Sequence, residues 1–280
     1  MSELIYFYQH LPFRFDSVVF SVGSFQLDWY SLMYLVGFSV VYLLLRYRTA
    51  KGENSVKIKR EALFDFFVYV FLGLLIGGRL GYVFFYNFSF YLSNPLQIIS
   101  PFDPGTHEFI GIYGMSYHGG LAGVLFVSWL FAKKRQINFW HLADFVVPAI
   151  PAGYFFGRIG NFLNGELYGR MTSKFWGMYF PGDLSGALRH PSVLYEAGLE
   201  GILLFLILWK LRNQKKLRRK MLGLYITLYA FFRIAVEFFR QPDQQIGYIF
   251  GVVTLGQILS LGMLFFGLLL LYSQRTKKMI

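Results

Sequence analysis

Seven long apolar stretches constrain this chain more than any other feature. A helix that crosses the hydrocarbon core of a bilayer needs about 20 mostly apolar residues. Stretches approaching that length lie at 29–45, 63–86, 111–132, 143–162, 193–211, 222–239 and 249–272. No soluble domain separates them. The sequence therefore predicts an all-α integral membrane protein with seven transmembrane helices, which form a single polytopic membrane domain over residues 1–280.

The composition disfavours an ordinary soluble enzyme and a disordered chain. Hydrophobic residues make up 55% of the sequence and charged residues 15%, whereas an average soluble domain is about 25% charged. The chain contains no cysteine, which excludes disulfides, thiolate metal sites and a cysteine nucleophile of its own. If thiol chemistry takes place here, the thiol must arrive with a substrate.

Basic residues predict the orientation in the membrane. The net charge of +12 could indicate a nucleic-acid partner, but most of the 27 Lys and Arg residues follow the first, third and fifth stretches or lie in the C-terminal tail. By the positive-inside rule, those segments are cytoplasmic and the N-terminus lies outside. The N-terminus lacks a basic n-region, so we expect no cleavable signal and a retained first span. No nucleic-acid partner is expected.

Two predicted outer segments are longer than simple turns require. Residues 87–110 and 163–191 are interrupted by prolines and glycines, so neither is expected to form a continuous helix. Their aromatic content favours order. Residues 18–27 could form a short outer hairpin or an interfacial strand.

Polar side chains inside the predicted spans converge on the outward leaflet. An arginine at the centre of a membrane helix costs about 2.5–3.5 kcal/mol and usually faces the bundle interior with a partner. Arg158, Arg233 and His118 lie in the outward halves of their spans, and Tyr30 and Arg79 lie near the same side. Arg79 could contact a lipid headgroup or snorkel to the interface.

The sixth stretch carries charges at helical spacing. Arg233, Glu237 and Arg240 occupy positions i, i+4 and i+7 and are predicted to share one helical face. Glu237 could orient either guanidinium and leave the other for an anion. A structural ion-pair ladder is the alternative.

The densest polar run near membrane depth covers residues 157–169. Arg158 and Asn161 lie at i and i+3, and the glycines around them allow close backbone approach. A guanidinium with amide donors suits a phosphate or phosphodiester. A polar contact between two helices is the alternative.

Three further side chains are weaker candidates. His118 is the best general-base candidate of the outward cluster because imidazole titrates near neutral pH, although a hydrogen bond to a neighbouring carbonyl would also explain it. Tyr30 and Tyr229 could be interface-belt residues. The chain has no His-Glu-x-x-His, Gly-x-x-x-x-Gly-Lys-Ser/Thr or Gly-x-Ser-x-Gly pattern. We expect no metal, nucleotide or other cofactor.

At residues 157–169 the sequence resembles the bacterial prolipoprotein diacylglyceryl transferases. The family motif Gly-Arg-x-Gly/Ala-Asn-Phe-x-Asn-x-Glu-x-x-Gly is met at every fixed position. Asp28 stands where family members typically carry a basic residue. Further agreement with the family comes from residues 29–30, 77–82, 117–121, 190–196 and 232–240.

The resemblance implies a reaction. The diacylglyceryl group of phosphatidylglycerol would pass to the lipobox cysteine of a prolipoprotein signal peptide, the first step of bacterial lipoprotein maturation. The enzyme would lie in the bacterial cytoplasmic (inner) membrane, among membrane lipids, with its active site toward the outer leaflet. A membrane transporter of an anionic or lipid-like substrate is the alternative, since buried charges also mark transport paths.

The resemblance also implies roles for individual residues. His118 would be the base, and Arg158 and Arg233 would bind the phosphate and stabilise the departing charge. The other side chains expected to position or enclose the phospholipid are Asn161, Glu166, Gly169, Tyr30, Tyr229, Glu237 and Arg240.

Overall fold

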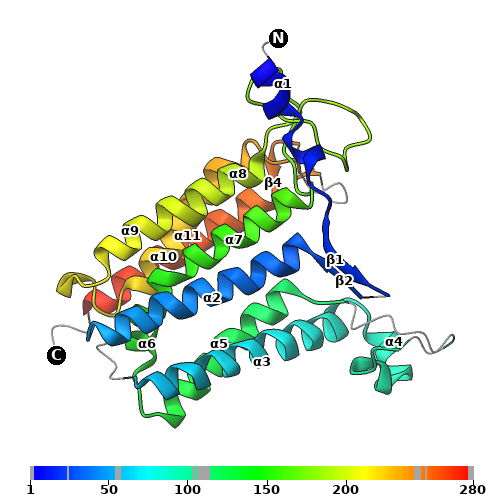
Figure 1. Cartoon of the computed structure of the whole chain (residues 1–280). Helices are drawn as coiled ribbons and strands as arrows, with labels where there is room; N and C mark the ends of the chain where they lie inside the picture. Colours follow the sequence, from blue (N-terminus) through cyan, green and yellow to red (C-terminus); the bar gives the residue numbers. More distant parts are fainter. Residues whose placement is uncertain are drawn as a thin grey trace. The chain divides into compact units, whose positions relative to one another are not determined.

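The computed structural model divides into two compact units. Unit 1 comprises Met1–Glu53 and Ala143–Ile280, and unit 2 comprises Asn54–Leu142. The start of the third predicted stretch, 111–113, and residues 103–104 and 106–110 of the predicted outer segment before it lie outside the described residues. The structure describes residues 3–23, 25–53, 58–102, 105, 114–242, 247–249 and 251–276 (Figure 1).

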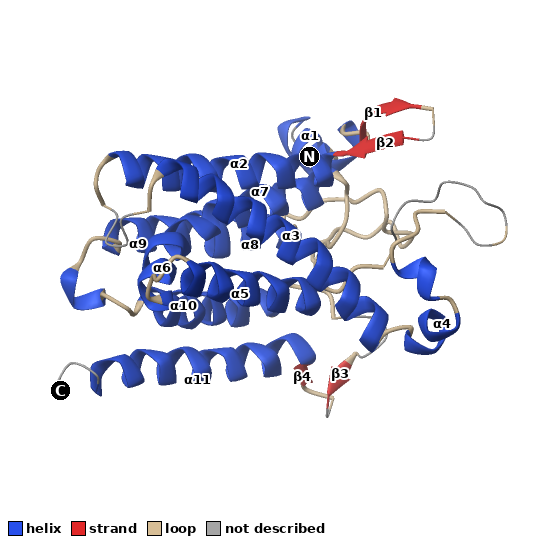
Figure 2. Ribbon diagram, turned by 90° about the horizontal axis from the view of Figure 1, so that it is seen from below, coloured by secondary structure: helices blue, strands red, loops and turns tan. Residues whose placement is uncertain are grey.

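Unit 1 begins with short elements that lead into a long helix. Strands β1 and β2 pair antiparallel, with Ser21 opposite Gln26 and Val22 opposite Phe25. They form a hairpin beside the N-terminal end of α2 (Figure 2), so the hairpin is the correct alternative for residues 18–27. The elements are α1 (Glu3–Gln9), the 3-10 helix η1 (Leu11–Arg14), β1 (Val18–Val22), β2 (Phe25–Asp28) and α2 (Trp29–Ala50).

The fourth and fifth predicted stretches are each built from three consecutive helical elements. Pro148 and Pro151 interrupt the fourth, since each lies at the first or second position of a helical element and proline cannot donate a backbone hydrogen bond. The fifth contains a π-helix. The fourth stretch is α6 (Phe139–Val146), η3 (Val147–Ala149) and α7 (Ile150–Leu163), and the fifth is α8 (Ser192–Glu196), η4 (Ala197–Leu203) and α9 (Leu204–Leu211).

The C-terminal part of unit 1 departs from the prediction at one boundary. The seventh stretch was expected to be helical from residue 249, but its helix begins at Leu255 because the preceding residues form a small hairpin. An apolar run alone does not distinguish a strand from a helix. The elements are η5 (Lys215–Leu217), α10 (Met221–Glu237), β3 (Tyr248–Ile249), β4 (Val253–Thr254) and α11 (Leu255–Thr276).

The long helices of unit 1 lie side by side (Figure 1), and glycines allow their closest approaches. A Cβ added to Gly37 of α2 would lie 2.8 Å from the carbonyl oxygen of Gly153 on α7. A Cβ on Gly201 of η4 would lie 2.8 Å from the Cβ of Phe155 on α7. Small residues at such contacts let backbones pack closely where lipid, rather than water, is the solvent.

Unit 2 is built around the pair α3 and α5, which also pack through glycines. A Cβ on Gly81 of α3 would lie 2.7 Å from the Cα of Gly119 on α5. The elements of unit 2 are α3 (Arg60–Phe85), α4 (Phe88–Ser93), η2 (Pro95–Ile98) and α5 (Tyr117–Lys134).

Arg79 of α3 holds the chain that follows this helix. Its guanidinium donates to the carbonyl oxygens of Gln97 at 2.6 Å, Ile98 at 2.7 Å and Gly114 at 3.3 Å. The residue is 9% exposed. Arg79 is therefore a buried anchor for the segment that follows α3, and neither the lipid-headgroup contact nor the snorkelling expected as alternatives describes it.

Five described helical stretches are long and apolar enough to cross a membrane, as expected for a multi-pass all-α membrane protein. α5 has 18 residues but begins with polar groups and ends in Lys133 and Lys134, and α10 has 17 residues. These two helices overlap the third and sixth predicted spans, but they are not among the five stretches that are long and apolar enough to cross a membrane. The five are Trp29–Ala50, Arg60–Phe85, Phe139–Leu163, Ser192–Leu211 and Leu255–Gln274.

Candidate active site

The C-terminal half of α7 supplies a connected set of polar side chains. Arg158 Nη1 donates to Asn161 Oδ1 at 2.9 Å, which confirms that the two residues share a helical face. Asn161 Nδ2 donates in turn to Glu166 Oε1 at 2.9 Å, just beyond the helix. Asn161 is buried and Glu166 is exposed. The chain of bonds therefore runs from the interior of unit 1 to its surface.

Tyr30 lies where α2 meets the end of α7. Its backbone N–H donates to Asn164 Oδ1 at 3.3 Å, and its hydroxyl donates to Tyr34 Oη at 3.0 Å. A Cβ on Gly160 would lie 2.9 Å from the Cα of Tyr30. Gly160, one of the glycines in the 157–169 run, therefore permits this close approach of the two helices. Tyr30 remains 36% exposed.

α10 carries Arg233 and Glu237, which pair as predicted. Arg233 Nη2 lies 3.2 Å from Glu237 Oε2, and Thr254 Oγ1 donates to Glu237 Oε1 at 2.9 Å. The prediction that Arg240 continues the same helical face is wrong, because α10 ends at Glu237. Arg240 instead forms a β-bridge with Gly169.

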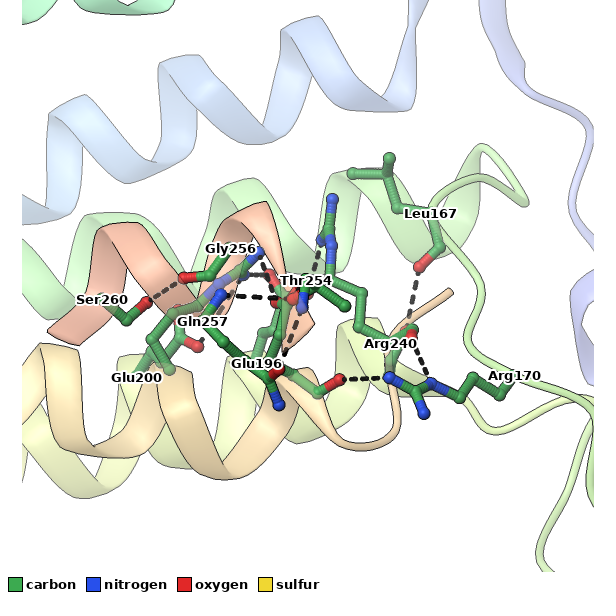
Figure 3. Close-up of polar contacts among 12 residues, drawn as sticks. Leu167, Arg170, Glu196, Glu200, Arg240, Thr254, Gly256, Gln257 and Ser260 are labelled. Atoms are coloured by element: carbon green, nitrogen blue, oxygen red, sulfur yellow. Dashed lines mark hydrogen bonds and ion pairs between the residues drawn. The ribbon is translucent and has the colours of Figure 1, made fainter. Parts of the chain in front are cut away.

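A glutamate that the sequence analysis left without a role joins the arginines. Glu196, the last residue of α8, has a side chain with 0% exposure. Arg158 Nε and Arg233 Nη1 lie 2.7 Å and 3.2 Å from its Oε2. Arg240 Nη1 donates to its Oε1 at 2.8 Å (Figure 3). We call the following five residues the arginine cluster: Arg158, Arg233, Arg240, Glu196 and Glu237.

Tyr154 and Glu200 contact residues of the arginine cluster. The sequence alone did not predict a role for either. Glu200 is one helical turn beyond Glu196, and Tyr154 is one turn before Arg158 on α7. The ring of Tyr229 packs edge-to-face on that of Tyr154 with centroids 5.9 Å apart. Glu196 and Glu200 lie at i and i+4 in an otherwise apolar stretch. This spacing could have identified them as candidate site residues, because ionisable residues inside membrane helices are usually functional.

Gly169 secures the loop between α7 and α8 to the end of α10. Its N–H donates to the His190 carbonyl at 2.8 Å, and a Cβ here would collide with the Phe239 carbonyl oxygen. The next residue, Arg170, donates from Nε to the Arg240 carbonyl at 2.9 Å (Figure 3). Backbone contacts thus position Arg240 although it lies beyond the helix.

A second ion pair organises the same loop. Arg189 Nε donates to Asp183 Oδ2 at 2.6 Å and its Nη2 donates to Oδ1 at 3.0 Å. Hydrogen bonds from the Arg189 guanidinium, and then from Ser185, lower the pKa of Asp183 from 3.8 to about 2. The loop is therefore held by a carboxylate that is ionised at any physiological pH.

His118 belongs to unit 2, whereas the arginine cluster belongs to unit 1. It lies in the first turn of α5, where Ser116 Oγ accepts from the Gly119 N–H at 3.2 Å and caps the helix. Its side chain is exposed. The predicted convergence of His118 with the arginines stays a prediction.

The arginine cluster has the chemistry of an anion site. Among the described residues, Arg158 Nη2 and the Nε and Nη2 of Arg240 have no hydrogen-bond partner, so their N–H groups can bind an oxyanion. The three guanidiniums are 15–20% exposed. Partly buried guanidiniums that are already paired can stabilise negative charge that grows on a phosphate without rearranging.

Comparison with known proteins identifies the family. A family model described as prolipoprotein diacylglyceryl transferase matches residues 17–273. The phosphatidylglycerol–prolipoprotein diacylglyceryl transferase of Chlorobaculum tepidum is 44% identical over 263 residues, which cover 92% of this chain and 90% of the relative. The enzymes of that name from Nitratidesulfovibrio vulgaris strain DP4 and Campylobacter lari are 46% identical over 259 residues and 41% over 274, covering 92% and 97% of this chain and 94% and 98% of theirs. The chain belongs to the prolipoprotein diacylglyceryl transferase family.

Proposed function

We propose that this membrane protein transfers the diacylglyceryl group of phosphatidylglycerol to the lipobox cysteine of a prolipoprotein, the first step of lipoprotein maturation. Family membership favours this transferase over a transporter of an anionic or lipid-like substrate. The observation that carries the proposal at the level of the site is the convergence of Arg158, Arg233 and Arg240 on buried Glu196.

The reaction makes one carbon–sulfur bond and breaks one carbon–oxygen bond. The cysteine sulfur attacks the glyceryl methylene carbon, and the electron pair of the broken bond goes to an oxygen of the departing glycerol phosphate. Arg158 and Arg233 bind this phosphate and stabilise its additional negative charge. A free thiol has a pKa near 8.5, so a base promotes attack; His118 takes this role and accepts the thiol proton.

The remaining predicted residues position the phospholipid. Asn161 and Glu166 continue the hydrogen-bonded chain from Arg158 and contact the headgroup. Gly169 serves the same site by holding the outer loop against the end of α10. Tyr30 and Tyr229 line the pocket for the acyl chains.

We further propose seven transmembrane helices, with α5 and α10 completing the set and both units forming one polytopic domain over residues 1–280. The N-terminus then lies outside and the C-terminus in the cytoplasm, with 87–110 and 163–191 as outer segments. The support is the concentration of Lys and Arg after α2, α5 and α9. In this orientation the arginine cluster faces the outer leaflet of the bacterial inner membrane.

Single-cysteine labelling tests the orientation without background, because the chain has no cysteine. Ser21→Cys, in the hairpin, is expected to react with a membrane-impermeant maleimide on spheroplasts. Gln214→Cys, in the basic loop after α9, is expected to react only after lysis. The opposite pattern would reverse the topology.

A transfer assay tests the activity. Purified protein, phosphatidylglycerol and a lipobox peptide are expected to yield a diacylglyceryl mass shift on the peptide cysteine and an equal amount of glycerol phosphate. A peptide with serine in place of cysteine is the matched control. Arg158→Lys and Arg233→Lys are expected to lower kcat at least 100-fold, of the order found when one such donor is removed. No mass shift with a competent peptide would refute the activity. Near-normal transfer by His118→Ala would refute its role as the base.

A further inference from the structure

The hydroxyl of Tyr154 lies within hydrogen-bond distance of two carboxylate oxygens, although it has one hydrogen to donate. It accepts from Arg158 Nε at 2.8 Å, and it lies 3.2 Å from Glu196 Oε2 and 2.5 Å from Glu200 Oε2. A tyrosine hydroxyl supplies one hydrogen. That hydrogen can occupy only one of the two oxygen–oxygen contacts. A hydrogen on a carboxyl group would satisfy the other contact, so the two contacts together fit a pair in which one glutamate is a neutral acid.

The ion pairs decide which glutamate carries the proton. The carboxylate oxygens of Glu196 form ion pairs with all three arginines of the arginine cluster, at nitrogen–oxygen distances of 2.7–3.2 Å. Among the described residues, the ion pair of Glu200 is with Arg233, whose Nη1 lies 3.9 Å from its Oε1. That oxygen is buried and has no hydrogen-bond partner among the described residues. An ionised carboxylate so placed would be very unfavourable, whereas a neutral acid is tolerated.

The backbone holds these groups at fixed positions. Glu200 lies in the π-helix η4, an arrangement that is rare and often marks functional sites. Gly201, the next residue, leaves space for Phe155, which follows Tyr154 on α7. α7 and η4 therefore approach closely enough for the hydroxyl to reach both carboxyl groups.

We infer that Glu200 is a neutral carboxylic acid in the resting enzyme: its O–H donates a hydrogen bond to the Tyr154 hydroxyl, which in turn donates a hydrogen bond to Glu196. Tyr154 and Glu200 then act as positioning residues, because Tyr154 accepts from Arg158 Nε and so helps to direct that guanidinium.

The neutral acid also sets the charge of the site. Three guanidiniums against two carboxylates leave the arginine cluster with a formal charge of +1. At its edge, Arg170 and Glu166 carry opposite charges that cancel. A phosphodiester headgroup carries one negative charge, so the site and the substrate of the proposed function are matched. An ionised Glu200 beside the cluster would bring the formal charge of the cluster and Glu200 together to zero and remove this attraction.

Infrared spectroscopy tests the protonation state directly. In detergent free of ester groups, at neutral pH, the wild-type spectrum minus that of Glu200→Gln is expected to contain the carbonyl stretch of a protonated carboxylic acid, shifted in D2O. This band does not depend on catalysis, so its absence would overturn the inference while leaving the proposed transferase activity intact.

Binding and kinetics provide the second test. Glu200→Ala removes the donor to Tyr154 and is expected to lower kcat about tenfold, whereas Glu200→Gln, whose amide can donate, is expected to recover most of that loss. Affinity for phosphatidylglycerol in mixed micelles is expected to change less than threefold in Glu200→Gln, because neither side chain is charged. If Glu200 were ionised, the same substitution would add a positive charge to the site. Binding tightened tenfold or more, or no rescue by glutamine, would overturn the inference.

Discussion

Glu196→Gln is the substitution that most directly tests the arginine cluster. It preserves the shape of the side chain and one acceptor oxygen but removes the only charge that three guanidiniums share. The positive charges of Arg158, Arg233 and Arg240 would then face one another with only Glu237 to balance them.

The expected cost follows from burial and distance. Removing one partner of a buried ion pair typically costs about 3–5 kcal/mol. The guanidiniums retain 15–20% exposure and can recover some solvation, so we expect about 3 kcal/mol in the free energy of unfolding. At roughly 2 °C per kcal/mol for a chain of this size, the unfolding midpoint falls by about 6 °C. Loss of guanidinium alignment adds about 2 kcal/mol to the transition-state barrier, or roughly 30-fold in kcat/KM.

Thermal unfolding in detergent and transfer kinetics with varied phosphatidylglycerol measure the two effects. Glu237→Gln is the matched comparison: among the described residues Glu237 forms an ion pair with Arg233 alone, so its substitution is expected to shift both quantities less. Gly262→Ala is the neutral control, since a Cβ there meets nothing within 4 Å. An unfolding midpoint within about 1 °C of wild type, together with kcat/KM within threefold, would refute the view that Glu196 organises the site.

Three other perturbations probe the framework around the site. Gly37→Ala places a Cβ 2.8 Å from the Gly153 carbonyl oxygen, which is expected to separate α2 from α7 and cost about 1–3 kcal/mol of stability in a thermal unfolding assay. The pKa of Asp183 is lowered to about 2 in the folded protein, so the stability that its pair with Arg189 contributes is present above pH 4 and lost as pH falls toward 2. Proteolysis of the loop between α7 and α8 with an acid-active protease measures this loss. Arg79→Ala removes the donor to three backbone carbonyls and is expected to cost about 2–3 kcal/mol, seen as faster proteolysis of the segment after α3.

Each of these perturbations has a control. Gly198→Ala, where a Cβ meets nothing within 4 Å, is expected to leave the unfolding midpoint within about 1 °C of wild type, and an equal loss in both alanine variants would contradict the packing argument for Gly37. Asp183→Asn is expected to make loop proteolysis nearly independent of pH between 4 and 2; unchanged pH dependence would assign the effect to other groups. Unaltered proteolysis in Arg79→Ala would contradict its anchoring role.

Local sequence patterns were sufficient for much of the architecture. The apolar stretches correctly located the long helices α2, α3 and α11 apart from their ends, because transfer into lipid depends on composition over about 20 residues. The bond between Arg158 and Asn161 was also predictable, since i and i+3 positions on a helix are neighbours whatever the rest of the chain does.

The sequence by itself determined the membrane class and the family motif, and it singled out Arg158 and Arg233, the arginines proposed to bind phosphate. Only the tertiary structure decided how those arginines are held. Glu196 comes from a different predicted span from Arg158 and Arg233, and the end of α10 releases Arg240 from the helical face that spacing assigned to it. Such contacts depend on which helices approach closely. Gly37 of α2 and Gly201 of η4 each lack a side chain where their helix meets α7, which allows the close approach. Helical periodicity describes one segment at a time, whereas the charge balance of a buried site depends on three segments meeting.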